Sequence, residues 1–300
     1  MPAPFELIAA PHTPCYPDGA LRLGTIDAQA EFLSRHSVQG VFVCGTTGEG
    51  LSLTTAERMA VLERWVKVSV GKLKVLAHVG HSCQREAVEL AEHAAKLGVA
   101  GVAALAPHFL KPATVQDLVD FLKPIAAACG KVPLLYYDIP SLTNVRHSAA
   151  RVMELALAQI PNFGGLKLTN PDLATLSECL SIAAGKVPVY FGQEELLLSA
   201  LPLGVRHAVG STFSMTSRLH LEIVASYDRG DMGTANDLQR QSLRVARVLE
   251  SFGGPVRAGK AMMALLGLDV GPVRPPLSLL TGEEATRFAE DVANLKGLNR

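Results

Sequence analysis

Short apolar segments recur along the chain, and each is followed by polar turn residues and then by a longer stretch with the spacing of a helix. Eight of these segments are rich in Val and Leu and mostly lack the strict alternation of a half-exposed strand. That pattern is typical of strands buried on both faces. The predicted strands are residues 5–10, 40–44, 74–79, 99–105, 133–137, 163–168, 187–191 and 206–209.

Residues typical of helix starts mark several of the segments between these strands. The expected starts are a capping box of Thr54 and Glu57, a Ser82 cap of residues 83–96, a Thr114 cap of residues 115–128, and Pro171 in the first turn of residues 172–183. Strands that alternate with helices of this length indicate βαβ units and a parallel sheet. Eight such units favour a closed barrel over an open doubly wound sheet.

After the eighth strand the pattern becomes purely helical. Four helices are expected, at residues 214–228, 232–252, 256–266 and 283–295. One of them completes the barrel and the other three form a C-terminal tail. The sequence therefore predicts an α/β protein, a (β/α)8 TIM barrel over residues 1–228 with a C-terminal helical extension over residues 229–300 that packs on the barrel as one structural unit.

Composition narrows the classes of function. The chain has 300 residues, 28 Lys and Arg against 28 Asp and Glu, and a formal net charge of zero. A neutral chain has no basic footprint for nucleic acid or an anionic membrane. The N-terminal segment lacks the pattern of a signal peptide, and no apolar run is long enough to span a bilayer. Five scattered cysteines favour a reducing compartment, so a cytoplasmic location is expected.

Chemistry in such a barrel sits at the carboxyl ends of the strands. Lys167 lies between leucines on the predicted sixth strand. Lysine is rarely buried unless it is paired or functional, and removal from water favours the neutral, nucleophilic amine. Lys167 is therefore a candidate Schiff-base nucleophile. The structural alternative is a lysine with its head group in solvent or paired with a barrel carboxylate such as Glu49.

Two further stretches at strand ends carry candidate chemistry. The run Gly45-Thr46-Thr47-Gly48-Glu49 offers hydroxyls and backbone N–H groups that can hold a carboxylate, although an ordinary βα turn gives the same pattern. Tyr137 ends the fifth strand, where a phenol near an iminium can shuttle protons. Tyr136 has the opposite strand parity and is expected to face the helices.

Metal chemistry is not expected, because the histidines and cysteines do not group with metal-ligand spacing. His78 and His81 come closest to the spacing of a metal-binding pair, and we expect them to have unrelated roles in a loop.

Taken together, Gly45-Thr46-Thr47-Gly48-Glu49, Tyr137-Asp138-Ile139-Pro140 and Gly165-Leu166-Lys167 resemble the dihydrodipicolinate synthase / N-acetylneuraminate lyase superfamily over nearly the whole chain. The resemblance implies a (β/α)8 barrel, usually in a homotetramer. It also implies an imine between a lysine and a 2-keto acid, with no cofactor and no metal.

Carried over motif by motif, the resemblance makes Lys167 the imine-forming lysine and Tyr137 the proton shuttle. Thr46 is implied as a proton relay, and Thr46 and Thr47 as ligands of the substrate carboxylate, together with Gly48. Further segments resemble sialic acid lyases of the animal type. In that group the positions that contact the sugar-acid hydroxyls correspond to Thr169, Gly192, Glu194, Glu195, Gly210 and Ser211.

One departure concerns the sugar end of the site. The lyases usually have aspartate where this chain has Glu194. One extra methylene displaces the carboxylate and requires repacking. The expected reaction is cleavage of N-acetylneuraminate to pyruvate and an aldehyde sugar, with a modified or shorter sugar acid left open as the substrate.

Three alternatives stay open. Dihydrodipicolinate synthases carry an arginine after the tyrosine motif and a tyrosine after the fourth strand, whereas this chain has Ser141-Leu142-Thr143 and His108-Phe109-Leu110. Dehydratases or aldolases acting on keto-deoxy sugar acids share the lysine and tyrosine. A non-catalytic keto-acid binding protein is the remote alternative, because a binder has no use for an imine lysine.

Overall fold

The computed structural model describes residues 4–300; residues 1–3 of the expected barrel lie outside the described residues. Eight parallel strands follow one another in chain order, and the order closes into a barrel. The strands are β1 (Glu6–Ala9), β2 (Gly40–Val43), β3 (Lys74–His78), β4 (Gly101–Leu105), β5 (Leu134–Asp138), β6 (Phe163–Leu168), β7 (Val189–Phe191) and β8 (His207–Gly210). The predicted (β/α)8 barrel is confirmed, and each predicted strand lies within two residues of its position.

The helices follow the expected alternation with the strands and then continue as the predicted C-terminal tail. The α-helices are α1 (Thr25–Arg35), α2 (Thr55–Ser69), α3 (Gln84–Lys96), α4 (Val115–Ala128), α5 (Pro140–Thr143), α6 (Ala149–Gln159), α7 (Leu173–Ala183), α8 (Leu197–Ala200), α9 (Phe213–Asp228), α10 (Met232–Ser251), α11 (Gly254–Leu265) and α12 (Gly282–Ala293). Short 3-10 turns are η1 (Gly50–Ser52), η2 (Glu194–Leu196) and η3 (Leu201–Leu203).

Helix capping agrees with the sequence at two starts and differs at two. Thr54 and Thr114 each accept from a backbone N–H in a full capping box, as expected at the first and with Asp117 as an additional partner at the second. The prediction of Ser82 as a cap is wrong, because Cys83 occupies the N-cap and makes no side-chain hydrogen bond there. Pro171 also lies outside α7, whose N-cap is Asp172.

Two compact units make up the structure. The central unit comprises residues 74–209, and the terminal unit comprises residues 4–73 and 210–300. In the central unit β3 to β7 pair in sequence, and α3, α4, α6 and α7 pack against their neighbours in that order. The expected boundary near residue 228, between barrel and extension, stays a prediction.

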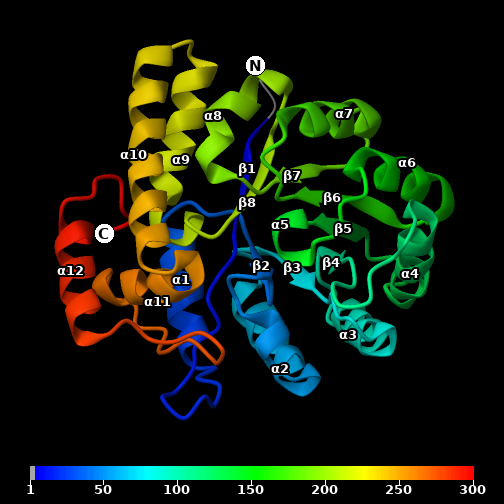
Figure 1. The fold of residues 1–300 in the computed structure, drawn as a ribbon, viewed down its shortest axis with the longest axis horizontal. Coiled ribbons are helices and arrows are strands. Elements are labelled where there is room, and N and C mark those ends of the chain that lie inside the picture. Colours follow the sequence, from blue (N-terminus) through cyan, green and yellow to red (C-terminus); the bar gives the residue numbers. More distant parts are fainter. Residues whose placement is uncertain (1–3) are drawn as a thin grey trace. The chain divides into compact units, whose positions relative to one another are not determined.

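In the terminal unit the tail helices lie against a barrel helix. The long helices α9 and α10 run side by side, and both α11 and α12 contact α10 (Figure 1). The end of the chain is fixed to α9, where the Asn299 N–H donates to the Met215 carbonyl at 2.6 Å and its amide donates to Ser217 Oγ at 3.0 Å. Among residues 4–300, no helix combines the length and hydropathy needed to cross a membrane.

Candidate active site

Three neighbouring strands of the central unit place the candidate nucleophile. Lys167 on β6 pairs in register with Tyr137 on β5 and with Tyr190 on β7. The lysine side chain is almost fully removed from solvent, at 5% exposure. A lysine held this deeply in a barrel needs a specific reason, because removal of an ammonium group from water is costly.

Lys167 and Tyr137 are brought together directly. The Lys167 Nζ lies 3.6 Å from the centre of the Tyr137 ring, a separation at which the ring face attracts a cation. The His78 ring meets the Tyr137 ring edge-on, with centroids 5.7 Å apart. The expectation of a loop role for His78 is therefore wrong, since this buried residue ends β3 and packs against the candidate proton shuttle.

Tyr136 turns to the other side of the sheet, as its strand parity predicts. Its hydroxyl donates to Asp138 Oδ1 at 3.2 Å. Burial raises the pKa of Asp138 to about 6, although hydrogen bonds from Tyr136 and Asn170 act in the opposite direction. Burial, and then the neighbouring Asp138 carboxylate, raise the pKa of Cys179 in α7 to about 12. The Tyr136–Asp138 pair therefore faces α7 and not the amine of Lys167.

The ends of β6 and β7 form a second close arrangement. The sheet hydrogen bonds continue past both strands, with Thr169 N–H donating to the Asp138 carbonyl and Gly192 N–H to the Leu168 carbonyl, both at 2.8 Å. A Cβ at Gly192 would lie 2.3 Å from Thr169 Oγ1. This hydroxyl is buried and has no hydrogen-bond partner among residues 4–300. It is therefore available to a ligand at the strand ends.

The two acidic candidates follow β7 directly. Glu194 and Glu195 open the turn η2, and both are half-buried. Both side chains are therefore partly accessible to solvent, and their backbone lies in a regular turn. In the terminal unit, the Gly210 carbonyl accepts from Ala10 N–H at 2.9 Å, which joins β8 to β1, and Ser211 follows it half-buried.

The loop after β2, residues 44–50 of the terminal unit, has an unusual backbone. Cys44 and Glu49 both have positive φ angles, at 56° and 52°. Such conformations are uncommon for residues other than glycine and cluster at functional sites. Gly50 is required in the same turn, because a Cβ there would lie 1.8 Å from the Cys44 carbonyl oxygen. Inside this loop Thr46 is exposed and Thr47 is buried.

Other residues of the terminal unit hold this loop in place. Thr13 Oγ1 donates to the Gly48 carbonyl at 2.6 Å. Glu49 Oε1 forms an ion pair with Lys260 Nζ on α11 at 2.7 Å, and Glu49 Oε2 accepts from Arg274 N–H at 2.7 Å. The alternative that paired Lys167 with Glu49 is therefore not supported, because Glu49 is engaged by the C-terminal tail.

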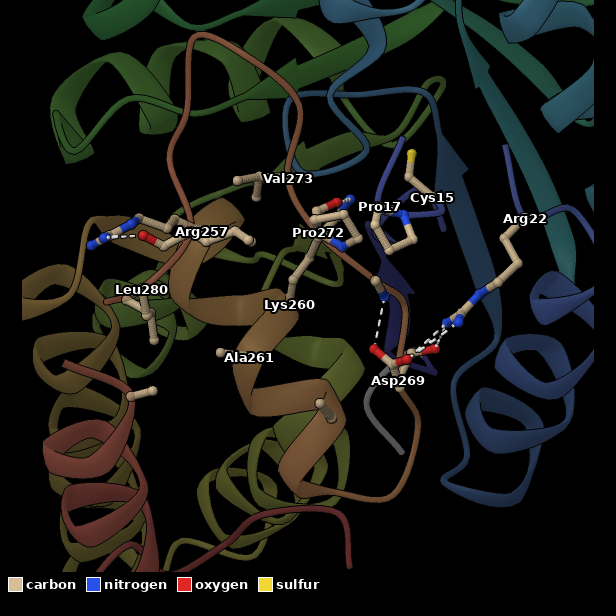
Figure 2. A pocket seen from close by; sticks show the side chains of 14 residues that line it. Cys15, Pro17, Arg22, Arg257, Lys260, Ala261, Asp269, Pro272, Val273 and Leu280 are labelled. Carbon is tan, nitrogen blue, oxygen red and sulfur yellow. Dashed lines mark hydrogen bonds and ion pairs between the residues drawn. The ribbon is translucent and has the colours of Figure 1, made fainter. Parts of the chain in front are cut away.

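A cavity of about 470 Å³ lies elsewhere in the terminal unit, between α11, the segment after β1 and the loop before α12 (Figure 2). Its walls include Cys15, Arg22, Arg257, Lys260 and Asp269, and none of the predicted site residues lines it. Within residues 4–300, no group of three or more His, Cys, Asp or Glu side chains could hold a metal ion. The expectation of metal-free chemistry stays a prediction.

Sequence reasoning missed several residues around the candidates. His78 ends an apolar run just as Tyr137 does, so its strand position was a usable signal. Asp138 follows Tyr137 in the quoted motif, and its alternation with Tyr136 could have indicated their pairing. Lys260 and Arg274 gave no signal, because each lies more than 200 residues from the loop that it contacts.

Comparisons with known proteins agree on one family. The sequence pattern of the dihydrodipicolinate synthetase family matches residues 3–295. N-acetylneuraminate lyase of Pongo abelii is 39% identical over 297 residues, which cover 98% of this chain and 92% of that protein. The enzyme of the same name from Homo sapiens is 38% identical over the same shares of both chains.

Solved structures agree with these relatives. N-acetylneuraminate lyase of Proteus mirabilis superimposes with a TM-score of 0.95 at 35% identity, over 98% of this chain and 99% of that one. N-acetylneuraminate lyase (sialic acid aldolase) of Aliivibrio salmonicida gives the same TM-score and identity, over 99% of both chains.

Proposed function

Because this chain belongs to the dihydrodipicolinate synthetase family, we propose that it cleaves N-acetylneuraminate to pyruvate and an aldehyde sugar through an imine on Lys167. It is a carbon–carbon lyase, like the N-acetylneuraminate lyases to which it is similar. The observation that carries the proposal is the burial of Lys167 on β6 with its Nζ 3.6 Å from the Tyr137 ring.

The reaction begins at the keto group of the open-chain sugar acid. Lys167 Nζ attacks C2, and the carbinolamine hydroxyl leaves as water after it takes the Tyr137 phenol proton, which gives a protonated imine and leaves Tyr137 as a phenolate. The family carry-over assigns the C1 carboxylate to the loop of Thr46, Thr47 and Gly48, whose hydroxyls and backbone N–H groups suit an anion. The fixed backbone of residues 44–50 supports this role, since a preformed loop loses little entropy on binding.

Bond cleavage needs a base at the C4 hydroxyl. The Tyr137 phenolate takes that proton, with Thr46 as its relay. The C4 oxygen becomes the aldehyde carbonyl of the departing sugar, and the C3–C4 electrons move into the iminium to form an enamine. Reprotonation at C3 and attack of water then release pyruvate and restore the Lys167 amine. The position of the Tyr137 ring beside Lys167 supports this assignment, because proton transfer requires short range to the reacting centre.

The polyhydroxylated end of the substrate requires polar groups at the neighbouring strand ends. Thr169, Gly192, Glu194 and Glu195 follow β6 and β7, Gly210 ends β8, and Ser211 comes directly after it. The Thr169 hydroxyl, which has no hydrogen-bond partner among residues 4–300, supports a ligand there, because a buried polar group costs free energy until it is hydrogen-bonded. Glu194 replaces the usual aspartate and reaches one methylene further toward the sugar.

As part of this proposal, the protein acts as a homotetramer in the cytoplasm and takes a small-molecule 2-keto acid as its partner. Phe109 and Leu110, after β4, are 83% and 81% exposed in the single chain. Adjacent apolar side chains with this exposure suit burial against another subunit. The five cysteines carry free thiols, which suits a reducing compartment.

Borohydride reduction in the presence of pyruvate tests the imine. The wild-type protein should gain the mass of one reduced pyruvate adduct per chain, and peptide mapping should place it on Lys167. The Lys167→Ala variant should gain none. An adduct on another lysine, or no adduct on the wild-type protein, would overturn the proposal.

A further inference from the structure

A buried ion pair joins the C-terminal tail to the loop after β2. Lys260 Nζ on α11 lies 2.7 Å from Glu49 Oε1, and the two side chains are only 3% and 4% exposed. Buried ion pairs add little net stability, because removal of both charges from water offsets their attraction. Net stability therefore does not explain this ion pair, and a role in positioning the loop after β2 does.

Residues of the C-terminal tail bind both carboxylate oxygens of Glu49. Lys260 binds Oε1 and also donates to the Pro272 carbonyl at 2.6 Å, and Figure 2 shows the side chain projecting from α11 toward Pro272. Arg274 N–H donates to Oε2 at 2.7 Å. Glu49 thus has its head group fixed by α11 and by the segment around Pro272.

The backbone of Glu49 in turn closes the turn that contains the two threonines. Glu49 N–H donates to the Thr46 carbonyl at 3.0 Å, and Gly50 N–H donates to the Gly45 carbonyl at 3.1 Å. Glu49 has the left-handed φ of 52° that this closure needs. A left-handed glutamate is unfavourable by itself, so surrounding contacts must hold it there. Loss of the contacts that hold the Glu49 side chain should therefore allow the backbone of the Thr46–Thr47 turn to change conformation.

We propose that Lys260 is a positioning residue for the reaction: through Glu49 it holds the Thr46–Thr47 turn in the geometry that binds the keto-acid carboxylate. This inference rests on the proposed function, which assigns the carboxylate to that turn. It makes the C-terminal tail part of the apparatus that selects a 2-keto acid, because Lys260 acts through Glu49.

The test measures the pyruvate concentration that gives half-maximal borohydride trapping on Lys167. Lys260→Met should raise it by about ten- to a hundredfold, because a displacement of about 1 Å at a binding group costs that much. KM for N-acetylneuraminate should rise by a similar factor, while kcat changes less. The matched control is Arg257→Met, which removes another ion pair of α11, to Glu284, and leaves Glu49 untouched.

Arg257→Met should lower Tm while the half-maximal pyruvate concentration stays within twofold of wild type. An equal rise of the half-maximal pyruvate concentration in both variants would overturn the inference. A general loosening of the tail would then explain the rise without a specific role for Lys260. If Lys260→Met fails to fold, the double variant Lys260→Met/Glu49→Gln leaves no unpaired buried charge. Its half-maximal concentration should still rise, and a wild-type value in a folded double variant would overturn the inference.

Trapping also separates this inference from the proposed function. A wild-type protein that forms no adduct would show that the imine assignment is wrong, before any variant is compared. A wild-type protein that traps pyruvate, beside a Lys260→Met variant that traps it at the same concentration, would contradict only the positioning role.

Discussion

The side-chain nitrogen of Lys167 lies 3.6 Å from the centre of the Tyr137 ring, and the two residues face each other in register on β6 and β5. Their relation is thus set by the sheet, not by a mobile loop. The ring face, and not only the phenol oxygen, is part of the lysine's surroundings. Removal of the hydroxyl alone should therefore leave the lysine where it is.

Tyr137→Phe separates proton transfer from imine formation. The variant keeps the ring beside Lys167 but loses the base for the C4 hydroxyl. Cleavage should slow by about 10²–10⁴-fold, the usual contribution of an acid–base group, while pyruvate trapping stays partly intact. Steady-state pyruvate release and borohydride trapping measure the two steps. Turnover like that of the wild type would show that Tyr137 is not the base.

The neighbouring phenol provides the control for that change. Tyr136→Phe also removes one tyrosine hydroxyl from β5, but that hydroxyl bonds to Asp138 on the side of α7. Turnover should stay within about threefold of wild type, since no reacting atom is involved. A loss as large as that of Tyr137→Phe would mean that the two effects reflect a damaged strand.

Glu194→Ala tests the sugar end of the site apart from the keto-acid end. A hydrogen bond to a charged group contributes about 1.5–3 kcal/mol, so KM for N-acetylneuraminate should rise by at least tenfold. Pyruvate has no sugar hydroxyls, so its half-maximal trapping concentration should not change. If both values rise together, Glu194 supports the fold of the site and does not contact the sugar.

Asp138 gives stability an unusual dependence on pH. Its pKa is raised to about 6 in the folded protein, above the ordinary 3.8, so the folded state holds the proton more tightly. Its contribution to the free energy of unfolding therefore falls as pH rises from about 4 to 6, by on the order of 3 kcal/mol. Asp138→Asn should gain stability relative to wild type across this window and keep the gain above pH 6.

Two buried histidines oppose this trend but do not obscure the comparison. Burial lowers the pKa of His12 and of His220 to about 4, so their contributions are lost as pH falls from about 6.5 to 4. Both histidines are present in the wild type and in Asp138→Asn, so their effects cancel in the difference. Denaturant unfolding at several pH values measures that difference, and a value independent of pH would contradict the raised pKa.

The sequence predicted the barrel well because its signals are local. Buried parallel strands leave continuous apolar runs, and the Thr54–Glu57 and Thr114 starts depend on neighbours within one turn. Lys167 was singled out as a candidate for the same reason, since a charge inside an apolar run stands out, and its burial on β6 agrees with that pattern. The pairing of Lys167 with Tyr137 followed from the family motifs, and the register of β5 and β6 gives it a physical basis.

Contacts between residues far apart in the chain could not be predicted from the sequence. Nothing near Lys260 indicates that its partner is Glu49, because the pair is made by the packing of the tail against the β2 loop. Ser82 and Pro171 were misplaced because several adjacent residues could each start the helix. In those turns Cys83 and Asp172 take the N-cap position instead.

The most direct test of the central claim is pyruvate release from N-acetylneuraminate by the purified protein, with Lys167→Ala measured beside it. The wild-type protein should release pyruvate in a linear, enzyme-dependent manner, and the variant should release none above background, because no other amine is expected to form the imine. Release by the variant at the wild-type rate would contradict the role of Lys167. Absence of release by the wild-type protein would contradict the assigned substrate.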